Sequence, residues 1–155
     1  MRDPLWHFIR TRRYARLALG LILCCSSLIC IDGFAQSART PASGSAEREA
    51  IMDALRVPAK KDLGRDVIFK VERLRVAGDW AFARVSPTLP DGSEIDYAKT
   101  KFRKQIELGA FDPQGEALLQ RDADGWKVLE WVFGRTDVAS VTWSERYRFP
   151  KSLLE

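Results

Sequence analysis

Hydrophobic and polar residues follow two different periods along this chain, and the periods predict its helices and strands. Ile51, Ala54 and Leu55 are spaced as on one face of a helix. Ser45 can cap the start of that helix, and Pro58 is expected to end it. The first structured element after residue 45 is therefore predicted to be an amphipathic helix.

From Val67 the apolar period becomes two, which is typical of β-strands. The pattern predicts a hairpin that turns at Gly78 and returns as far as Val85. The apolar residues change parity halfway along the outgoing strand, so we expect a β-bulge near Glu72 or Arg73.

A second helix, a second hairpin and a last helix are predicted after it. Phe102 and Ile106 predict a helix over residues 97–108, and a second hairpin is predicted with strands at 116–121 and 126–133. Thr136 or Asp137 can cap a last helix through Val138, Val141 and Tyr147, which Pro150 is expected to end. The order helix, hairpin, helix, hairpin, helix predicts an α+β fold: an antiparallel sheet of two hairpins with the helices packed on one face.

The first 35 residues read as an export signal. Four arginines between positions 10 and 16 precede an uncharged run from Leu17 to Ile31, and cleavage is expected between Ala35 and Gln36. The run has 15 residues, whereas a membrane-spanning helix needs about 20. A periplasmic or secreted protein is therefore expected, with an uncleaved membrane tether as the alternative.

Two other kinds of signal fit the sequence less well. A lipid-modified cysteine normally follows a small residue, but Cys24, Cys25 and Cys30 follow leucine, cysteine and isoleucine. The stretch Thr11-Arg12-Arg13-Tyr14 loosely resembles a twin-arginine signal, so the route of export stays open.

The predicted signal peptide, the composition and the predicted elements together divide the chain into four parts. The expected boundaries are a signal peptide at 1–35, a disordered spacer at 36–45, a single α+β domain at 46–150 and a C-terminal tail at 151–155. About 120 residues remain after cleavage, which is enough for one domain.

Cleavage would also remove His7, the only histidine, and all three cysteines. The remaining domain could not use a histidine base, a cysteine nucleophile, a disulfide or a cysteine or histidine metal site. No cofactor or metal is expected. Residues 1–35 hold five arginines and two aspartates, which leaves 20 basic and 19 acidic residues, so a nucleic-acid partner is not expected either.

The candidate site residues are one acid and one arginine. Glu130 lies within an apolar strand and is expected on the same face as Trp126, Val128 and Val132, where burial would raise its pKa. Arg84 occupies the equivalent part of the first hairpin and could pair with Glu130 across the sheet. The pair fits either a small-molecule site or a structural ion pair.

Three motifs resemble a family of small exported bacterial proteins of unknown function. They are Arg48-Glu49-Ala50-Ile51-Met52-Asp53-Ala54-Leu55-Arg56, Val76-Ala77-Gly78-Asp79-Trp80-Ala81-Phe82, and Gly125 to Gly134 with Thr136-Asp137-Val138. The resemblance implies no activity. In architecture, one helix against a curved sheet is similar to cystatin-like and nuclear-transport-factor-like folds, which host enzymes and binding modules alike.

Two functions are therefore predicted as alternatives. The first is a non-enzymatic binding or accessory module that presents its sheet or a groove to a partner in the cell envelope. The second is a small-molecule-binding protein or carboxylate-based enzyme with a pocket between helix and sheet, built around Glu130 and Arg84. Membrane contact is expected only through an uncleaved signal.

Overall fold

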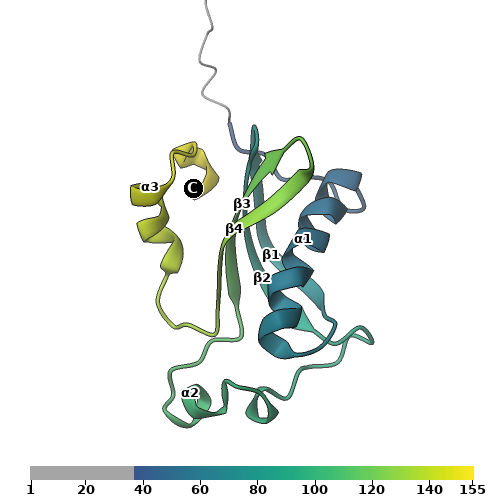
Figure 1. Ribbon diagram of the computed structural model, residues 1–155, viewed down its shortest axis with the longest axis vertical. Helices are drawn as coiled ribbons and strands as arrows, with labels where there is room; N and C mark the ends of the chain where they lie inside the picture. Colours follow the sequence, from purple (N-terminus) through teal and green to yellow (C-terminus); the bar gives the residue numbers. More distant parts are fainter. Residues whose placement is uncertain (1–36) are drawn as a thin grey trace, which may run out of the picture. The chain divides into compact units, whose positions relative to one another are not determined.

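A computed structural model describes residues 37–155, and it confirms the α+β class. Four antiparallel strands form one sheet in the order β1-β2-β3-β4 (Figure 1). They are β1 (Ile68–Ala77), β2 (Trp80–Thr88), β3 (Gly115–Asp122) and β4 (Gly125–Phe133). The strands are the two hairpins predicted from the sequence, and β2 pairs with β3 to join them.

Helix α1 (Ala46–Leu63) begins where predicted but is longer than expected. The Ser45 side chain accepts a hydrogen bond from the Arg48 amide, as an N-cap does. Pro58 lies inside the helix and does not end it. Proline removes only one backbone hydrogen bond, and the buried side chains of the following turn hold the helix against the core. The helix ends at Gly64, whose φ of 70° suits glycine.

One face of the sheet packs against α1. The buried side chains of this core come from α1 and from alternate positions of the first three strands. They are Ile51, Met52, Leu55, Leu74, Val76, Ala81, Ala83, Val85, Ala117 and Leu119. The predicted β-bulge is present, because the pairing of β1 with β2 shifts between Val71 and Arg73. It brings both halves of β1 onto this core.

A second bulge, in β4, was not predicted. Leu118 pairs with Glu130 and Leu119 pairs with Val128, so Leu129 is an extra residue. Trp126 and Val128 contact the α1 core, whereas Glu130 contacts residues on the opposite face. The prediction that Glu130 shares a face with Trp126 and Val128 is therefore wrong, because the bulge reverses the alternation between them.

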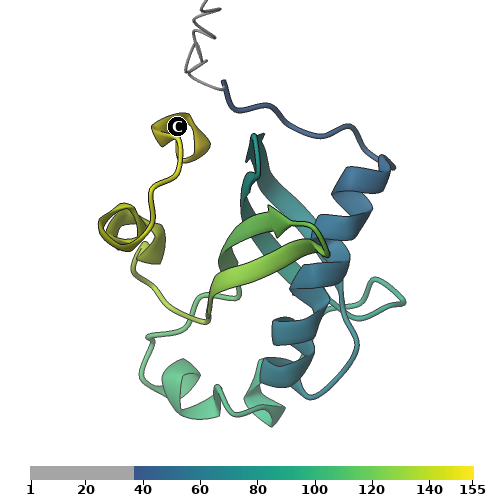
Figure 2. The ribbon, with the colours of Figure 1, turned by 45° about the horizontal axis from the view of Figure 1, so that its top comes forward.

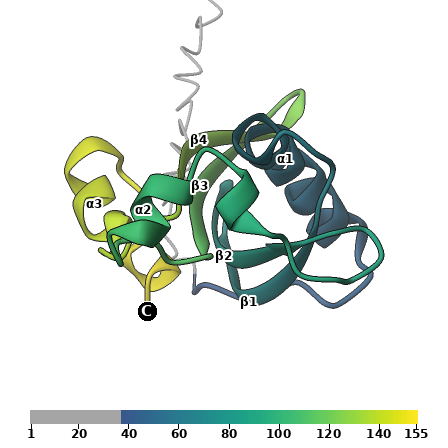
Figure 3. The ribbon, with the colours of Figure 1, turned by 90° about the horizontal axis from the view of Figure 1, so that it is seen from below.

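The opposite face of the sheet is covered by the end of the chain. Three short helical turns follow β4: η2 (Ala139–Thr142), α3 (Trp143–Arg146) and η3 (Lys151–Leu153). Trp143 and Leu153 are buried there against Phe82 and Leu118. Figures 1, 2 and 3 show α1 and α3 on opposite sides of the sheet. The helices thus occupy both faces, not the single face predicted.

This packing also corrects two expectations about the C-terminal region. The expected apolar stripe of a last helix included Val138 and Val141, but both are exposed, and the buried residue is Trp143. The expected tail at 151–155 contains Leu153, which is completely buried. The folded domain therefore extends beyond residue 150.

The helix predicted over residues 97–108 is divided into η1 (Tyr97–Lys99) and α2 (Arg103–Glu107). Thr100 has an extended backbone between them. Its hydroxyl donates to the Tyr97 carbonyl and accepts from the Phe102 amide, and such local bonding competes with a helix. Phe102 packs into an aromatic cluster with Phe111 and Phe133.

The segment before α1 is attached to the sheet, although a disordered spacer was expected. Arg39 and Val76 exchange two backbone hydrogen bonds of 2.9 and 2.8 Å. The Arg39 guanidinium also binds Glu47 of α1 through two hydrogen bonds. The predicted signal peptide and its cleavage site between Ala35 and Gln36 lie outside the described residues.

Candidate functional site

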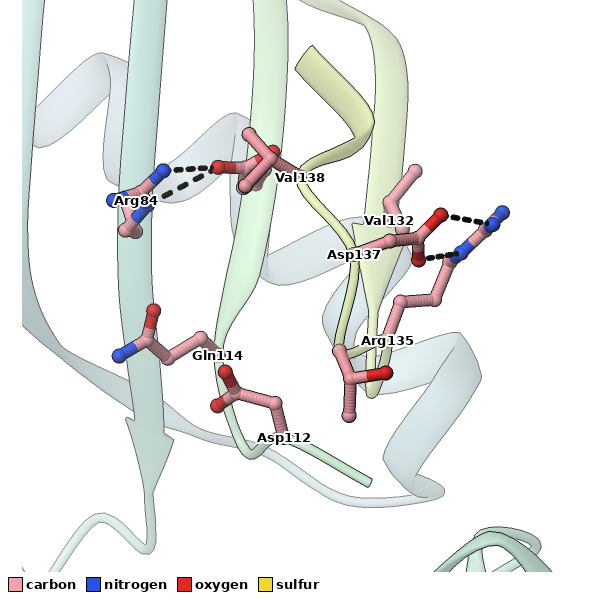
Figure 4. A pocket seen from close by; sticks show the side chains of 9 residues that line it. Arg84, Asp112, Gln114, Val132, Arg135, Asp137 and Val138 are labelled. Atoms are coloured by element: carbon pink, nitrogen blue, oxygen red, sulfur yellow. Dashed lines mark hydrogen bonds and ion pairs between the residues drawn. The ribbon is translucent and has the colours of Figure 1, made fainter. Parts of the chain in front are cut away.

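A polar cavity of about 130 Å³ lies on the face of the sheet opposite α1 (Figure 4). Strands β2, β3 and β4 form its floor, and the segment that leads from β4 to η2 forms its wall. Its lining consists of Arg84, Asp112, Gln114, Glu116, Val132, Arg135, Thr136, Asp137 and Val138.

Arg84 and Glu116 form the charged pair of this cavity. Arg84 Nε and Nη2 donate to Glu116 Oε1 at 3.1 and 2.5 Å. The other carboxylate oxygen, Oε2, accepts from the Ser140 amide at 3.1 Å. Glu116 is buried, and both of its oxygens are occupied. It therefore fastens η2 to the sheet through hydrogen bonds to a charged group.

The expected pairing of Arg84 with Glu130 is wrong. Arg84 lies directly opposite Glu116 in the sheet, whereas Glu130 lies opposite Leu118. Glu130 instead accepts a hydrogen bond from the Tyr147 hydroxyl at 2.9 Å and forms an ion pair with Arg146 at 2.6 Å. The hydrogen bond to Glu130 raises the pKa of Tyr147, with smaller contributions from burial and from the Glu130 charge.

Sequence reasoning missed Glu116. Its signal is its position: a charged residue that directly precedes the apolar run Ala117-Leu118-Leu119 at the start of a strand. Antiparallel pairing of β3 with β2 places Glu116 beside Arg84. The sequence of a single hairpin does not show which of its strands pairs with the other hairpin.

The second ion pair of the cavity is also closed. Arg135 donates from Nε and Nη2 to the two oxygens of Asp137 at 2.7 and 2.6 Å. These hydrogen bonds lower the pKa of Asp137. Figure 4 shows this pair on the β4 side of the cavity, with Asp112 and Gln114 on the other side. Each guanidinium of the cavity already has a carboxylate partner, whereas within residues 37–155 the side chain of Asp112 has none.

A larger groove runs between α1 and β4. Its volume is about 630 Å³. Its lining is mostly apolar and comprises Ala54, Val57, Pro58, Lys61, Trp126, Lys127, Val128, Leu129 and Trp131. Val57 is 72% exposed and Leu129 is 37% exposed at its surface. Large side chains of this kind are expensive to leave in water, so the groove is a candidate binding surface.

The groove has a rigid wall and a positive charge. The Trp131 indole Nε1 donates to Asp62 at 2.9 Å, and its ring stacks on Phe133 with an interplanar angle of 3°. Lys127 forms ion pairs with Asp122 and Asp124 of the adjacent turn. Lys61 has no ion pair within residues 37–155, and no carboxylate lines the groove.

The part of the chain that the structure describes shows neither a metal-binding cluster nor a membrane-spanning helix. Residues 37–155 contain no cluster of three histidine, cysteine or acidic residues that could hold a metal ion. No helix in the same range is long and apolar enough to cross a membrane.

Comparison of the chain with known protein families, with curated proteins and with solved structures finds no match. The resemblance to small exported bacterial proteins therefore stays a prediction, and function must be argued from the geometry.

Proposed function

We propose that this chain is an exported, non-enzymatic binding domain, and that it holds apolar side chains of a partner in the groove between α1 and β4. The observation that carries the proposal is the contrast between the two cavities. The polar cavity is small and both of its arginines are paired with carboxylates, whereas the groove is several times larger and exposes apolar side chains.

The groove is prepared for binding in two ways. Asp62 and Phe133 fix the Trp131 ring, so little side-chain freedom would be lost when a partner contacts it. Burial of the Val57 and Leu129 side chains by a partner would stabilise the complex, because both are exposed in the free protein. Rigid aromatic anchors surrounded by exposed aliphatic residues are typical of protein interfaces.

A matched pair of variants tests the proposal. Val57→Asp places a charge in the groove, and Val141→Asp places one at a similarly exposed position (68%) outside it. Tagged protein from cells that express the full chain is crosslinked in the envelope, and captured partners are quantified against an unrelated exported protein. We expect Val57→Asp to reduce capture of the same partner at least tenfold and Val141→Asp to leave it unchanged.

Equal capture by both variants, or no partner above the control, contradicts the proposal. Thermal unfolding of both variants shows whether the substitution has acted on the fold instead. Leu129→Asp is a second groove variant on a different element and should behave as Val57→Asp does.

Export is tested separately. The intact mass of the protein recovered from the envelope should correspond to a chain that begins at Gln36. A mass that includes residues 1–35 would contradict cleavage and support the membrane-tethered alternative.

A second candidate function is binding of a small polar ligand at the cavity of Figure 4. It is favoured by Asp112, Gln114 and Thr136, whose side chains have no hydrogen-bond partner within residues 37–155. A thermal-shift screen of small polar metabolites tests it. A genuine ligand stabilises the natural protein and Gln105→Ala, which alters an exposed glutamine outside the cavity, but not Gln114→Ala.

A further inference from the structure

The two edges of the sheet differ in a way that points to how a partner binds. At the β1 edge, both backbone groups of Val76 bind Arg39. Charged residues occupy much of the rest of β1, at Lys70, Glu72, Arg73 and Arg75. A short additional strand and edge charges are common means by which proteins prevent strands from adding to a sheet.

The β4 edge lacks this protection. Strand β4 pairs only with β3, and within residues 37–155 no backbone hydrogen bond joins it to any other segment. In an antiparallel edge strand, every second residue directs its N–H and C=O groups away from the sheet. Its two charged residues are engaged elsewhere, Lys127 with the hairpin turn and Glu130 with Tyr147 and Arg146.

The unprotected edge coincides with the apolar groove. Trp126, Val128, Leu129 and Trp131 belong to β4 and also line the groove between β4 and α1. An extended chain laid along β4 could use main-chain hydrogen bonds on one side and place alternate side chains in the groove. Six residues of such a chain span about 20 Å at about 3.3 Å per residue.

Charge indicates what the added chain contains. The groove lining holds two lysines and no carboxylate, and Lys61 has no ion pair within the described part of the chain. An acidic side chain is therefore favoured near Lys61, and a basic one is disfavoured.

We propose that β4 accepts an extended segment of a partner protein as a fifth strand, with apolar side chains of that segment in the groove and an acidic side chain facing Lys61. This inference rests on the proposed function, because it specifies the partner of the same groove. It excludes a globular partner that merely covers Val57 and Leu129.

Synthetic peptides provide the test. The probe is an eight-residue peptide that alternates valine and glutamate. One control alternates valine and lysine, and another has the composition of the probe but groups its glutamates and valines in two blocks. Protein purified from cells that express the full chain is titrated with each peptide, and hydrogen exchange is measured at the amides of β1 and β4.

We expect the alternating acidic peptide to bind at least tenfold more tightly than either control. It should slow exchange in residues 125–133 and leave residues 68–77 unchanged. Lys61→Glu should weaken binding about threefold to tenfold, because an exposed charge contact contributes little more than about 1 kcal/mol and the substitution reverses it. Lys104→Glu alters a lysine of α2 that has no ion pair within residues 37–155 and should have no effect.

Several outcomes would overturn strand addition. They are equal binding of the block peptide, protection at β1 instead of β4, no protection at β4 at millimolar peptide, or β4 protection that rises with protein concentration alone, which would indicate pairing of two copies. If strand addition fails but Val57→Asp still abolishes partner capture, the groove is the binding surface. Only the proposal that the partner binds as an extended strand is then wrong.

Discussion

The indole of Trp131 lies directly over Gly115 of the neighbouring strand. A Cβ atom at position 115 would lie 2.7 Å from Cζ3 of that indole and still closer to Cη2, so no larger residue fits without movement of the ring. Gly115 does not have a positive φ, and its absent side chain is what the packing requires. The geometry of the proposed binding groove therefore depends on a glycine that lies outside its lining.

Gly115→Ala should consequently disturb both stability and the groove. Overpacking of this kind typically costs about 1–3 kcal/mol, which urea unfolding followed by tryptophan fluorescence would detect. The combination with Trp131→Phe should lose less than the sum of the two single variants, because the smaller ring makes room for the methyl group. Additive losses would show that the two residues do not compete for the same space.

Glu116 is expected to be the most important acid of the domain for stability. Glu116→Gln leaves Arg84 without a carboxylate, and the side chain of Arg84 is only 32% exposed. Loss of one partner of a fully buried pair costs about 3–5 kcal/mol, and the partial exposure of Arg84 reduces the expected loss to about 2 kcal/mol. Glu145→Gln, at an exposed acid of α3, is the control and should change the free energy of unfolding by less than about 0.5 kcal/mol.

The C-terminal turn should contribute strongly to stability. Leu153→Ala removes a completely buried side chain from the core under η3 and should cost about 2–4 kcal/mol. Leu108→Ala changes a leucine that is 71% exposed and should have almost no effect. Chemical unfolding of the two variants under the same conditions gives the comparison. Equal losses would mean that residues 151–155 do not pack as described.

The predicted hairpins and first bulge were correct, whereas the strand faces and side-chain pairings that depend on register were not. The hairpin turns and the bulge after Val71 were found because the apolar alternation changes within a few residues. The bulge at Leu129 was missed because Val128, Leu129, Trp131 and Val132 are all apolar, so no parity change is visible. That one extra residue reversed the predicted face of Glu130 relative to Trp126.

The candidate site was therefore predicted only in part. Arg84 is a member of the polar cavity, but its partner is set by the pairing of β2 with β3, a contact between residues 32 positions apart. The expected stripe of the last helix left out Trp143 for a related reason. Its burial depends on the chain folding back over Phe82, and the local pattern instead favoured Val138 and Val141. The period of the apolar residues indicates which side chains share a face, but it does not indicate which part of the chain covers that face.

Alkaline pH should destabilise the domain through Tyr97. Burial raises the pKa of its hydroxyl from 10.0 to about 12, and the nearby charge of Glu94 adds to the effect. The ring packs against Phe111, and the hydroxyl donates to the Pro87 carbonyl at 3.2 Å. Because the folded state favours the neutral phenol, this stabilisation is complete below pH 10 and is lost as the pH rises towards 12.

Tyr97→Phe should consequently flatten the dependence of stability on pH in that range. The variant loses the hydrogen bond to Pro87 and is less stable than the natural protein at neutral pH. The difference between the two proteins should shrink as the pH rises from about 10 to about 12, since only the natural protein has a phenol to ionise at this position. Tyr147→Phe removes a second tyrosine whose pKa is raised and serves as the comparison. Urea unfolding midpoints across this range provide the measurement, and parallel pH profiles for the natural protein and Tyr97→Phe would show that Tyr97 ionises as freely in the folded protein as in the unfolded chain.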